Sequence, residues 1–138
     1  MKLDAISKRL VNDICYSVIG AAIEVHKELG PGLLESIYEE CLCEELQDRG
    51  IKFKRQAKLP LLYKNKILDK SLFLDVLVED LVIIEIKAVD VLLPIHEAQL
   101  LTYLRLAKKP KGLLINFNVD NISKTLISLV SKHFEKLE

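Results

Sequence analysis

Three charged residues interrupt two strongly apolar segments and could together surround a metal ion. Glu85 and Lys87 lie in the otherwise apolar segment Leu81–Val89, and Asp75 interrupts the apolar segment Leu72–Val78. A charged group at the centre of an apolar strand is unfavourable unless it is paired or bound to a metal ion. Two converging carboxylates repel each other and favour a hard divalent cation, Mg²⁺ or Mn²⁺.

Whether these groups meet depends on the turn between the two segments. If residues 79–81 form a three-residue loop, Asp75 lies directly opposite Glu85. A two-residue turn would instead oppose Asp75 with Ile84 and separate the two carboxylates onto opposite sides of the sheet. Glu85 and Lys87 share a face in either case, because they are two residues apart on a strand. We favour the three-residue loop and predict a carboxylate pair with an amine beside it.

Hydrophobic periodicity predicts the elements that position these groups. Apolar residues at three- and four-residue steps predict an amphipathic helix from Leu3 to about Leu29, ended by Gly30 and Pro31. The pattern then predicts a second helix that closes near Gly50, extended pieces at 51–57 and 59–63, strands at 72–78 and 81–87, a buried helix at 95–107, a strand at 112–117 and a helix at 122–134. This order, α-α-β-β-β-β-α-β-α, predicts an α/β (α+β) domain over residues 1–138, with a single mixed sheet flanked by helices.

The composition is that of one folded domain. The chain has 138 residues, of which 50% are hydrophobic and 29% charged, and this excludes disordered and low-complexity classes. No uncharged apolar stretch approaches the ~20 residues that span a bilayer, and residues 1–15 lack the apolar stretch of a signal peptide. Cys15, Cys41 and Cys43 form neither a disulfide framework nor a zinc pattern, so we expect them to be packing residues. We therefore expect a cytoplasmic protein.

Opposite charges are separated along the chain although they cancel overall. The net charge of +0 argues against a structural role in coating DNA, because phosphate contacts require basic residues. Five acidic residues crowd the second predicted helix: Glu39, Glu40, Glu44, Glu45 and Asp48. Eight basic residues follow with only Asp69 among them: Arg49, Lys52, Lys54, Arg55, Lys58, Lys64, Lys66 and Lys70. These runs are either solvated faces or, for the basic one, an edge that attracts phosphate.

Asp75 followed by Glu85-Ile86-Lys87 resembles the D…E-x-K motif of the PD-(D/E)XK nuclease superfamily. Gly32-Leu-Leu-Glu-Ser-Ile-Tyr38 looks like the signature of the small GxxExxY proteins, which are grouped within that superfamily. Gln99-Leu-Leu-Thr-Tyr103 is similar to the Q-x-x-x-Y motif of RecB-like nucleases. Together these motifs cover residues 20–118.

The resemblance implies a restriction-endonuclease-like core and metal-dependent hydrolysis of phosphodiester bonds in nucleic acid, with DNA as the expected partner. Asp75 and Glu85 would ligate Mg²⁺ or Mn²⁺, with the backbone carbonyl of Ile86 as a third ligand. Lys87 would orient the attacking water or stabilise the charge that develops on the phosphate.

The resemblance also implies roles for three helical residues. Glu35 would hold a water or complete the metal site, and Gln99 and Tyr103 would steady the metal site or the nucleic-acid backbone. The sequence departs from the family pattern before the aspartate: Leu74 stands where the superfamily's name has proline, and Phe73 where close relatives are expected to have a basic residue.

Structural alternatives exist for each of these residues. Lys87 could simply neutralise one carboxylate, and Glu35 could serve as a capping glutamate for a helix that begins at Gly32. Gln99 and Tyr103, one turn apart, could satisfy each other. The functional alternative is a catalytically silent nuclease-like module that binds nucleic acid or a protein partner. A homodimer formed through the long apolar stripe of the first helix is a further expectation.

Overall fold

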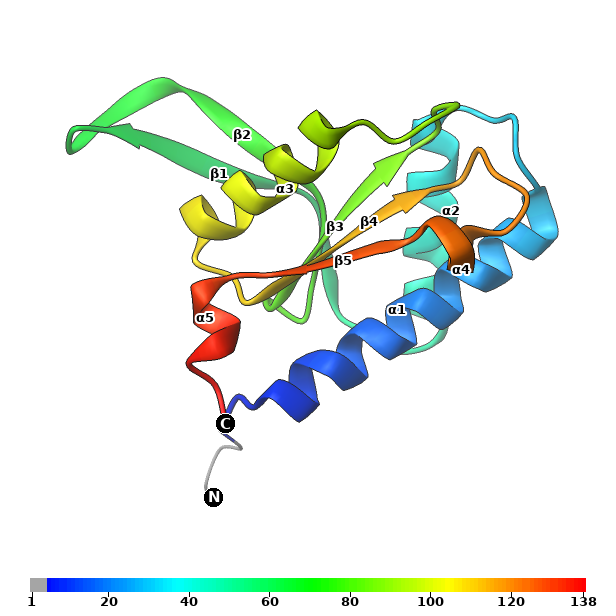
Figure 1. Cartoon of the computed structure of the whole chain (residues 1–138), viewed down its shortest axis with the longest axis horizontal. Coiled ribbons are helices and arrows are strands. Elements are labelled where there is room, and N and C mark those ends of the chain that lie inside the picture. Colours follow the sequence, from blue (N-terminus) through cyan, green and yellow to red (C-terminus); the bar gives the residue numbers. More distant parts are fainter. Residues whose placement is uncertain (1–4) are drawn as a thin grey trace.

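The computed structural model describes residues 5–138 and contains one five-stranded sheet with helices on both faces (Figure 1). The elements, in chain order, are α1 (Lys8–Leu29), α2 (Glu35–Asp48), β1 (Phe53–Tyr63), β2 (Lys66–Val78), β3 (Val82–Lys87), α3 (Pro94–Ala107), β4 (Lys111–Asn116), α4 (Ile122–Thr125), β5 (Ile127–Val130) and α5 (Lys132–Glu135). The predicted α/β (α+β) class with a single mixed sheet flanked by helices is confirmed.

The sheet has the order β1-β2-β3-β4-β5 and is mixed. Only β3 and β4 pair in parallel, because α3 connects them as a crossover, and the other neighbours are antiparallel. Both faces of the central strands are covered. Ile84 and Ile86 pack in the hydrophobic cluster with α1 and α2, and Ile83 packs on the other side against α3. Burial on both faces explains why β3 is apolar along nearly its whole length.

The first helix follows the predicted pattern. The Ser7 side chain caps its start by accepting a hydrogen bond from the Leu10 N–H at 3.1 Å, and Gly30, with φ of 67°, ends it. Leu3, the first residue of the predicted stripe, lies outside the described residues. Of the rest of the stripe, Val18, Ala21 and Val25 are buried in the core, whereas Ile6 and Leu10 are 49% and 38% exposed. A homodimer formed through this stripe stays a prediction.

The segment after α3 differs from the prediction. A single helix over 122–134 was expected, but α4, β5 and α5 divide this segment. β5 pairs antiparallel with β4, and its alternating side chains Ile127 and Leu129 pack on the cluster beneath α3. The helical prediction is wrong because the open edge of β4 offers partners for the backbone, and because β-branched residues favour a strand once one is available.

Two other predictions need correction. The extended pieces at 51–57 and 59–63 are one strand, β1, so three strands rather than four precede α3. The helix at 95–107 is not buried all round: Leu100 and Leu104 are buried, but Ile95 is 67% exposed. It lies as a single outer layer on its face of the sheet, so only the side toward the strands is covered.

Buried cysteines belong to the packing, as the sequence predicts. Cys15 and Cys43 lie in the cluster beneath α1 and α2, and burial raises the pKa of each thiol from 9.0 to about 11. Cys41 is partly buried against the same cluster. Of the helices that the structure describes, none is long and apolar enough to cross a membrane.

Candidate active site

The pair β1 and β2 is irregular at Asp75. The residues on both sides pair in one antiparallel register, but Gln56 and Asp75 do not pair with each other. Gln56 has a φ of 50°, a left-handed backbone that non-glycine residues rarely adopt. Leu74 packs on the α3 side of the sheet and Val76, two residues later, on the opposite side. This kink turns the Asp75 side chain toward β3.

β2 and β3 separate at the same place. Their pairing runs from Val78 opposite Val82 to Val76 opposite Ile84 and then ends. This register confirms the three-residue loop. Beyond the last pair, the Ile86 N–H donates to the Oδ2 atom of Asp75 at 2.8 Å. The carboxylate thus occupies the fork between the strands, and the register brings Asp75 beside Glu85.

Glu85 is a buried carboxyl group with 5% of its surface exposed. Burial, and secondly repulsion from the Asp75 charge, raise its pKa from 4.5 to about 8. Within residues 5–138, its Oε1 atom has no hydrogen-bond partner. Buried carboxyl oxygens are nearly always hydrogen-bonded in native proteins, so this atom calls for a water, an ion or a catalytic role.

Opposing effects also act on the pKa of Asp75. Burial and the Glu39 charge raise its pKa above 3.8, whereas the Ile86 N–H, the Lys87 charge and a hydrogen bond from Gln56 lower it. In the described part of the chain, neither Asp75, Glu85 nor Lys87 forms a salt bridge. The alternative in which Lys87 neutralises one carboxylate in a closed ion pair is therefore not what is observed.

The chain after Lys87 is fixed by the neighbouring strand. Asn116, only 2% exposed, lies opposite Lys87 on β4. Its side chain donates to the Val89 carbonyl at 2.8 Å and accepts from the Val89 N–H at 3.0 Å. The Phe117 N–H donates to the Lys87 carbonyl at 2.9 Å. These bonds hold the end of β3 and so position Lys87 relative to the carboxylates.

Comparisons with known proteins give one match. The family model described as the PD-(D/E)XK nuclease superfamily matches residues 12–128, most of the chain. The chain belongs to this superfamily. No curated protein and no solved structure matches it significantly. The matched region includes the kinked strand pair and the acid-x-lysine strand just described.

The turn before α2 in this PD-(D/E)XK chain positions Glu35 near the end of β3. Gly32 adopts a φ of 101°, and the Tyr38 hydroxyl donates to the Gly30 carbonyl and accepts from the Leu33 N–H. The Tyr38 ring is fully buried and stacks on Phe117 with ring centroids 4.6 Å apart. The glycine and tyrosine of the motif therefore shape the turn from which the glutamate emerges.

Glu35 is the first residue of α2 rather than its third. A capping role from Gly32, the alternative reading, would require the third position, and the helix begins after Leu34 without a side-chain cap. The Oε2 atom of Glu35 instead accepts a hydrogen bond from the Ala88 N–H at 3.3 Å. This contact brings Glu35 to the residue that follows Lys87, at the end of β3.

Glu39 joins the site, and the sequence reasoning missed it. It is 8% exposed, and its carboxylate accepts from Arg55 Nε at 2.6 Å and from Gln56 Nε2 at 2.8 Å. Gln56 Nε2 also lies 3.5 Å from Asp75 Oδ1. The available signal was spacing: Glu39 is four residues after Glu35, on the same face of one helix. The sequence reading treated it as one acid in a crowded run.

Gln99 and Tyr103 bond to each other, with the Nε2 of Gln99 donating to the Tyr103 hydroxyl at 2.8 Å. Tyr103 also packs against the cluster between α3 and the sheet. No hydrogen bond joins either residue to Asp75, Glu85 or Lys87 in the structure of residues 5–138. The mutual pairing anticipated as an alternative is the arrangement observed.

The donor set suits one kind of metal. Among residues 5–138 there is no cluster of three or more His, Cys, Asp and Glu side chains able to hold an ion. Mg²⁺ does not need such a cluster, because it usually retains several waters and binds proteins through one or two carboxylates. Asp75, Glu85 with its unpartnered oxygen, and the Ile86 carbonyl are hard oxygen donors without a His or Cys from residues 5–138 beside them, so these residues suit Mg²⁺ or Mn²⁺ better than zinc.

Proposed function

We propose that this chain is a metal-dependent nuclease that hydrolyses phosphodiester bonds in DNA. The observation that carries the proposal is the buried Glu85 carboxyl group, unpartnered at Oε1 among the described residues, next to Asp75 and on the same face of the strand as Lys87. Membership of the PD-(D/E)XK nuclease superfamily supports it.

Asp75, Glu85 and the Ile86 carbonyl would hold Mg²⁺ or Mn²⁺. When bound, such an ion lowers the pKa of a water molecule and neutralises charge on the phosphate. The pair has a reason to bind a cation. Each carboxylate is destabilised by burial and by a neighbouring negative charge, so a positive ion between them would relieve both effects.

The remaining groups would act on water and phosphate. Water adds to phosphorus, the phosphorus–oxygen bond to the leaving group breaks, and the products are a phosphomonoester and an alcohol. Lys87, partly buried and in no salt bridge with a described residue, would orient the attacking water or stabilise charge on the phosphate oxygens. Glu35, held at the end of β3 by the Ala88 N–H, would hold a water or complete the metal site.

The finer family assignment rests on two motifs. The turn built by Gly32 and Tyr38 supports placing the chain with the GxxExxY proteins, because it gives each motif residue a physical task. The RecB-like assignment rests on Gln99 and Tyr103, which would steady the metal site or the backbone of the nucleic acid after their mutual hydrogen bond opens. A cytoplasmic setting is part of the proposal, supported by the free thiols of the three cysteines.

The direct test is incubation of the purified chain with single-stranded, duplex and branched DNA in Mg²⁺ or Mn²⁺. Cleavage by the native chain that is lost in Asp75→Asn and Lys87→Met supports the proposal. Lys124→Met on α4 is a control for loss of a lysine, because Lys124 is exposed and, among the described residues, forms no salt bridge with a carboxylate of the site. Cleavage that survives Asp75→Asn would contradict the assignment.

The second candidate is a silent module that binds nucleic acid or a protein without cutting. The mutual hydrogen bond of Gln99 and Tyr103 favours it, because these residues are occupied with each other rather than with the carboxylates. Calorimetric titration with Mg²⁺ separates the two candidates. Heat of binding that disappears in Glu85→Gln counts against the silent module, and no heat with the native chain counts against the nuclease.

A further inference from the structure

β1 and β2 extend beyond the body of the protein as a two-stranded arm, residues 58–73 (Figure 1). The arm ends in a tight turn at Lys64 and Asn65, both with left-handed φ, of 48° and 68°. Leu59 at its base packs on the cluster beneath α3, but no residue from 60 to 73 belongs to either hydrophobic cluster. An isolated two-stranded ribbon is marginally stable in water, so the arm is suited to work against a partner.

The arm is basic although the chain is neutral. It carries four lysines, Lys58, Lys64, Lys66 and Lys70, against one acidic residue, Asp69. All four lysines are exposed, and none forms a salt bridge with a described residue. The net charge of the arm suits a polyanion. It also disfavours a second copy of the arm, because two such surfaces would repel each other.

The tip of the arm also exposes apolar side chains. Leu62 and Ile67 are opposite each other across the two strands and are 63% and 76% exposed. Tyr63 is 61% exposed, and the Lys64 ammonium lies 5.5 Å from the centre of its ring. Proteins that bind the minor groove of duplex DNA combine basic residues with apolar side chains that insert between base steps.

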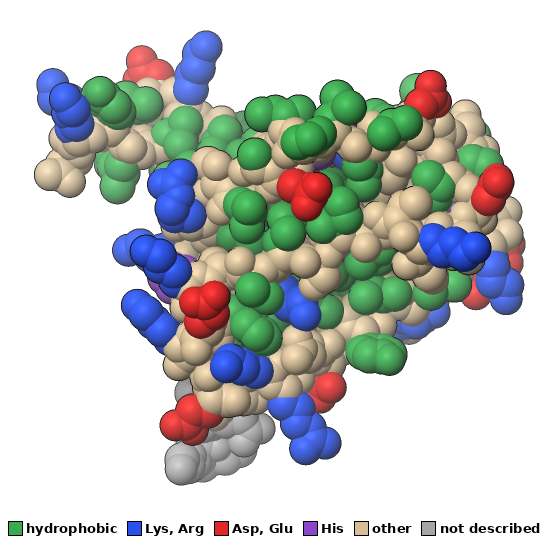
Figure 2. Space-filling model, viewed as in Figure 1, with side chains coloured by type: hydrophobic (Ala, Val, Ile, Leu, Met, Phe, Trp, Pro, Cys, Tyr) green, Lys and Arg blue, Asp and Glu red, His purple; other side chains and the backbone are tan. Residues whose placement is uncertain are grey.

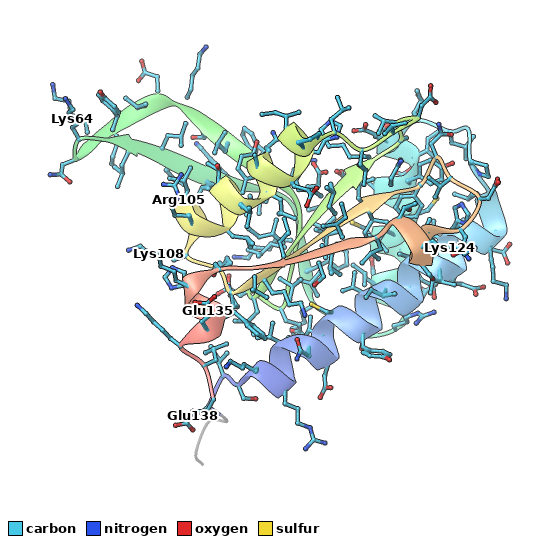
Figure 3. The ribbon with its side chains drawn as sticks, in the orientation of Figure 1. Lys64, Arg105, Lys108, Lys124, Glu135 and Glu138 are labelled. Atoms are coloured by element: carbon cyan, nitrogen blue, oxygen red, sulfur yellow. The ribbon has the colours of Figure 1, made fainter. Side chains whose placement is uncertain are left out.

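The basic surface continues from the arm onto the body. A cavity of about 280 Å³ lies between the base of the arm and the end of α3. Lys54, Lys58 and Lys109 are among its lining residues, together with Asp80, which pairs with Lys109 at 3.0 Å and leaves Lys54 and Lys58 as the cations that form no salt bridge with a described residue. Figure 3 shows Lys64, Arg105 and Lys108 along the same edge of the molecule. Space-filling atoms of Lys and Arg follow this edge in Figure 2.

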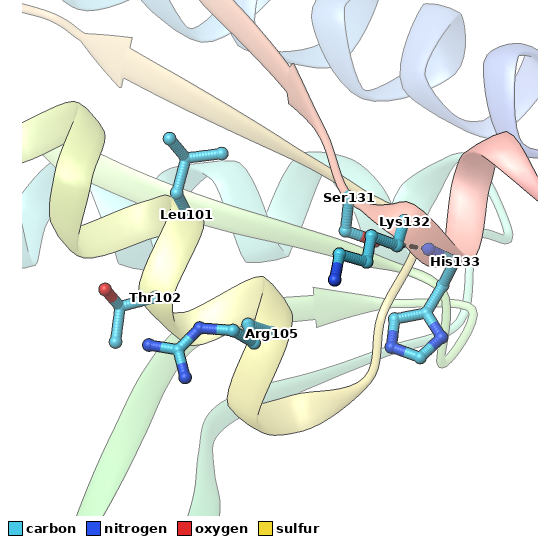
Figure 4. A pocket seen from close by; sticks show the side chains of 6 residues that line it. All are labelled: Leu101, Thr102, Arg105, Ser131, Lys132 and His133. Carbon is cyan, nitrogen blue, oxygen red and sulfur yellow. Dashed lines mark hydrogen bonds between the residues drawn. The ribbon is translucent and has the colours of Figure 1, made fainter.

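A second cavity extends the edge toward the C-terminus. It has a volume of about 310 Å³, lies between α3 and α5, and is lined by Leu101, Thr102, Arg105, Ser131, Lys132 and His133 (Figure 4). Two of these six residues, Arg105 and Lys132, are positively charged and none is acidic, so the lining adds to the same positive surface. Glu135, on α5, is the acidic residue labelled beside it in Figure 3.

The arm starts at the candidate active site. Gln56 and Asp75, the unpaired residues at the kink, come just before and just after it in β1 and β2. At about 3.3 Å per residue, the tip lies roughly 30 Å along the strands from Asp75. This length is close to the ~34 Å of one turn of duplex DNA.

From these observations we infer that the arm and the basic edge next to it form the surface that grips duplex DNA. The lysines would contact phosphates, the apolar tip would enter a groove, and the duplex would lie with one strand near Asp75. This inference deepens the proposed nuclease function and rests on it for the position of the cleaved strand. Binding itself needs no cleavage and can be measured separately.

The test measures the affinity of a short labelled duplex for metal-free protein by fluorescence anisotropy, over a range of KCl concentrations. Replacing Lys64, Lys66 and Lys70 together by Gln is expected to weaken binding about tenfold or more. It should also reduce the slope of log affinity against log salt by about 2 to 3, because each lost phosphate contact removes about 0.9. Lys124→Gln, remote from the arm, is expected to change neither quantity.

A second variant separates charge from apolar contact. Leu62→Ser with Ile67→Ser is expected to weaken binding without changing the salt slope, since no phosphate contact is lost. Because residues 60–73 lie outside both hydrophobic clusters, circular dichroism of all these variants should retain the native spectrum.

Three outcomes would overturn the inference. One is a triple lysine variant that binds duplex like Lys124→Gln. Another is a single strand that binds more tightly than the duplex. The third is light scattering in which the arm variants convert a dimer into monomers while the affinity for duplex stays unchanged, which would make a second copy the arm's partner. Arm-dependent binding by a native chain that cleaves nothing would support the surface while refuting the nuclease proposal.

Discussion

The carboxylate of Asp75 and the backbone N–H of Ile86 are joined by a 2.8 Å hydrogen bond at the point where β2 and β3 stop pairing. The Asp75 carboxylate accepts a hydrogen bond from an N–H group that has no backbone partner on β2, because the pairing of β2 with β3 has ended. It also fixes one oxygen of Asp75 next to the strand that carries Glu85 and Lys87. The fork between the strands is therefore what converts three charged residues into one site.

The stability of the protein should depend on pH through the protonation of Glu85. Its pKa is raised from 4.5 to about 8 on folding, so the folded chain keeps a proton that the unfolded chain releases between these values. Stability is then greatest below about pH 4.5 as far as this group is concerned, and it falls as the pH rises through about 8, by on the order of a few kcal/mol. Urea denaturation of metal-free protein across this range measures the fall. In Glu85→Gln, the free energy of unfolding should fall less with pH. An unchanged fall in that variant would show that Glu85 is not its cause.

Divalent metal should reverse this loss. Mg²⁺ that binds only the folded chain stabilises it by mass action, by about 2.7 kcal/mol at a hundredfold excess over Kd. We expect a higher melting temperature at pH 8 with MgCl₂ than with KCl of equal ionic strength. The control variants Asp75→Asn and Glu85→Gln should show no such difference. An equal rise in both variants would locate the ion elsewhere.

Two substitutions of Gln56 should differ from each other in stability but reduce cleavage alike. Gln56→Ala removes the contacts with Glu39 and Asp75 but keeps the unfavourable φ of 50°, whereas Gln56→Gly removes the contacts and relieves that backbone. We expect the glycine variant to be more stable than the alanine variant by about 1 kcal/mol. Both should cleave DNA more slowly, because Asp75 loses the contact from Gln56 and keeps only the bond from the Ile86 N–H. Native cleavage rates in both variants would show that Gln56 does not position Asp75.

The Tyr38 hydroxyl should stabilise the turn before α2. Tyr38→Phe keeps the ring on Phe117 but leaves the Gly30 carbonyl and the Leu33 N–H without this partner, at a cost of about 1 to 3 kcal/mol. Tyr16→Phe is a matched control, because Tyr16 is 82% exposed and should change stability by less than about 0.5 kcal/mol. Equal urea midpoints for the two variants would remove the turn-stabilising role.

Much of the site is already determined by local pattern. The apolar segments around Asp75 and Glu85 predict buried strands, and the short connection between them leaves two registers, in one of which the two carboxylates meet; the pairing of Val78 with Val82 selects that register. The GxxExxY spacing likewise reflects local geometry, because Gly32, Glu35 and Tyr38 all act within one turn and the first helical turn after it. Such relations depend on residues a few positions apart and on a strand period of two.

The tertiary structure alone decided the rest, because it depends on contacts between distant segments. Glu39 enters the site only because Arg55 and Gln56 approach it from β1. The final segment becomes β5 rather than a helix because the edge of β4 is open to it, which no local period records. The kink at Gln56 and Asp75 is set in the same way, by the different sides of the sheet on which Leu74 and Val76 must pack. Burial of Glu85 beneath these layers, rather than its sequence neighbours, is what raises its pKa.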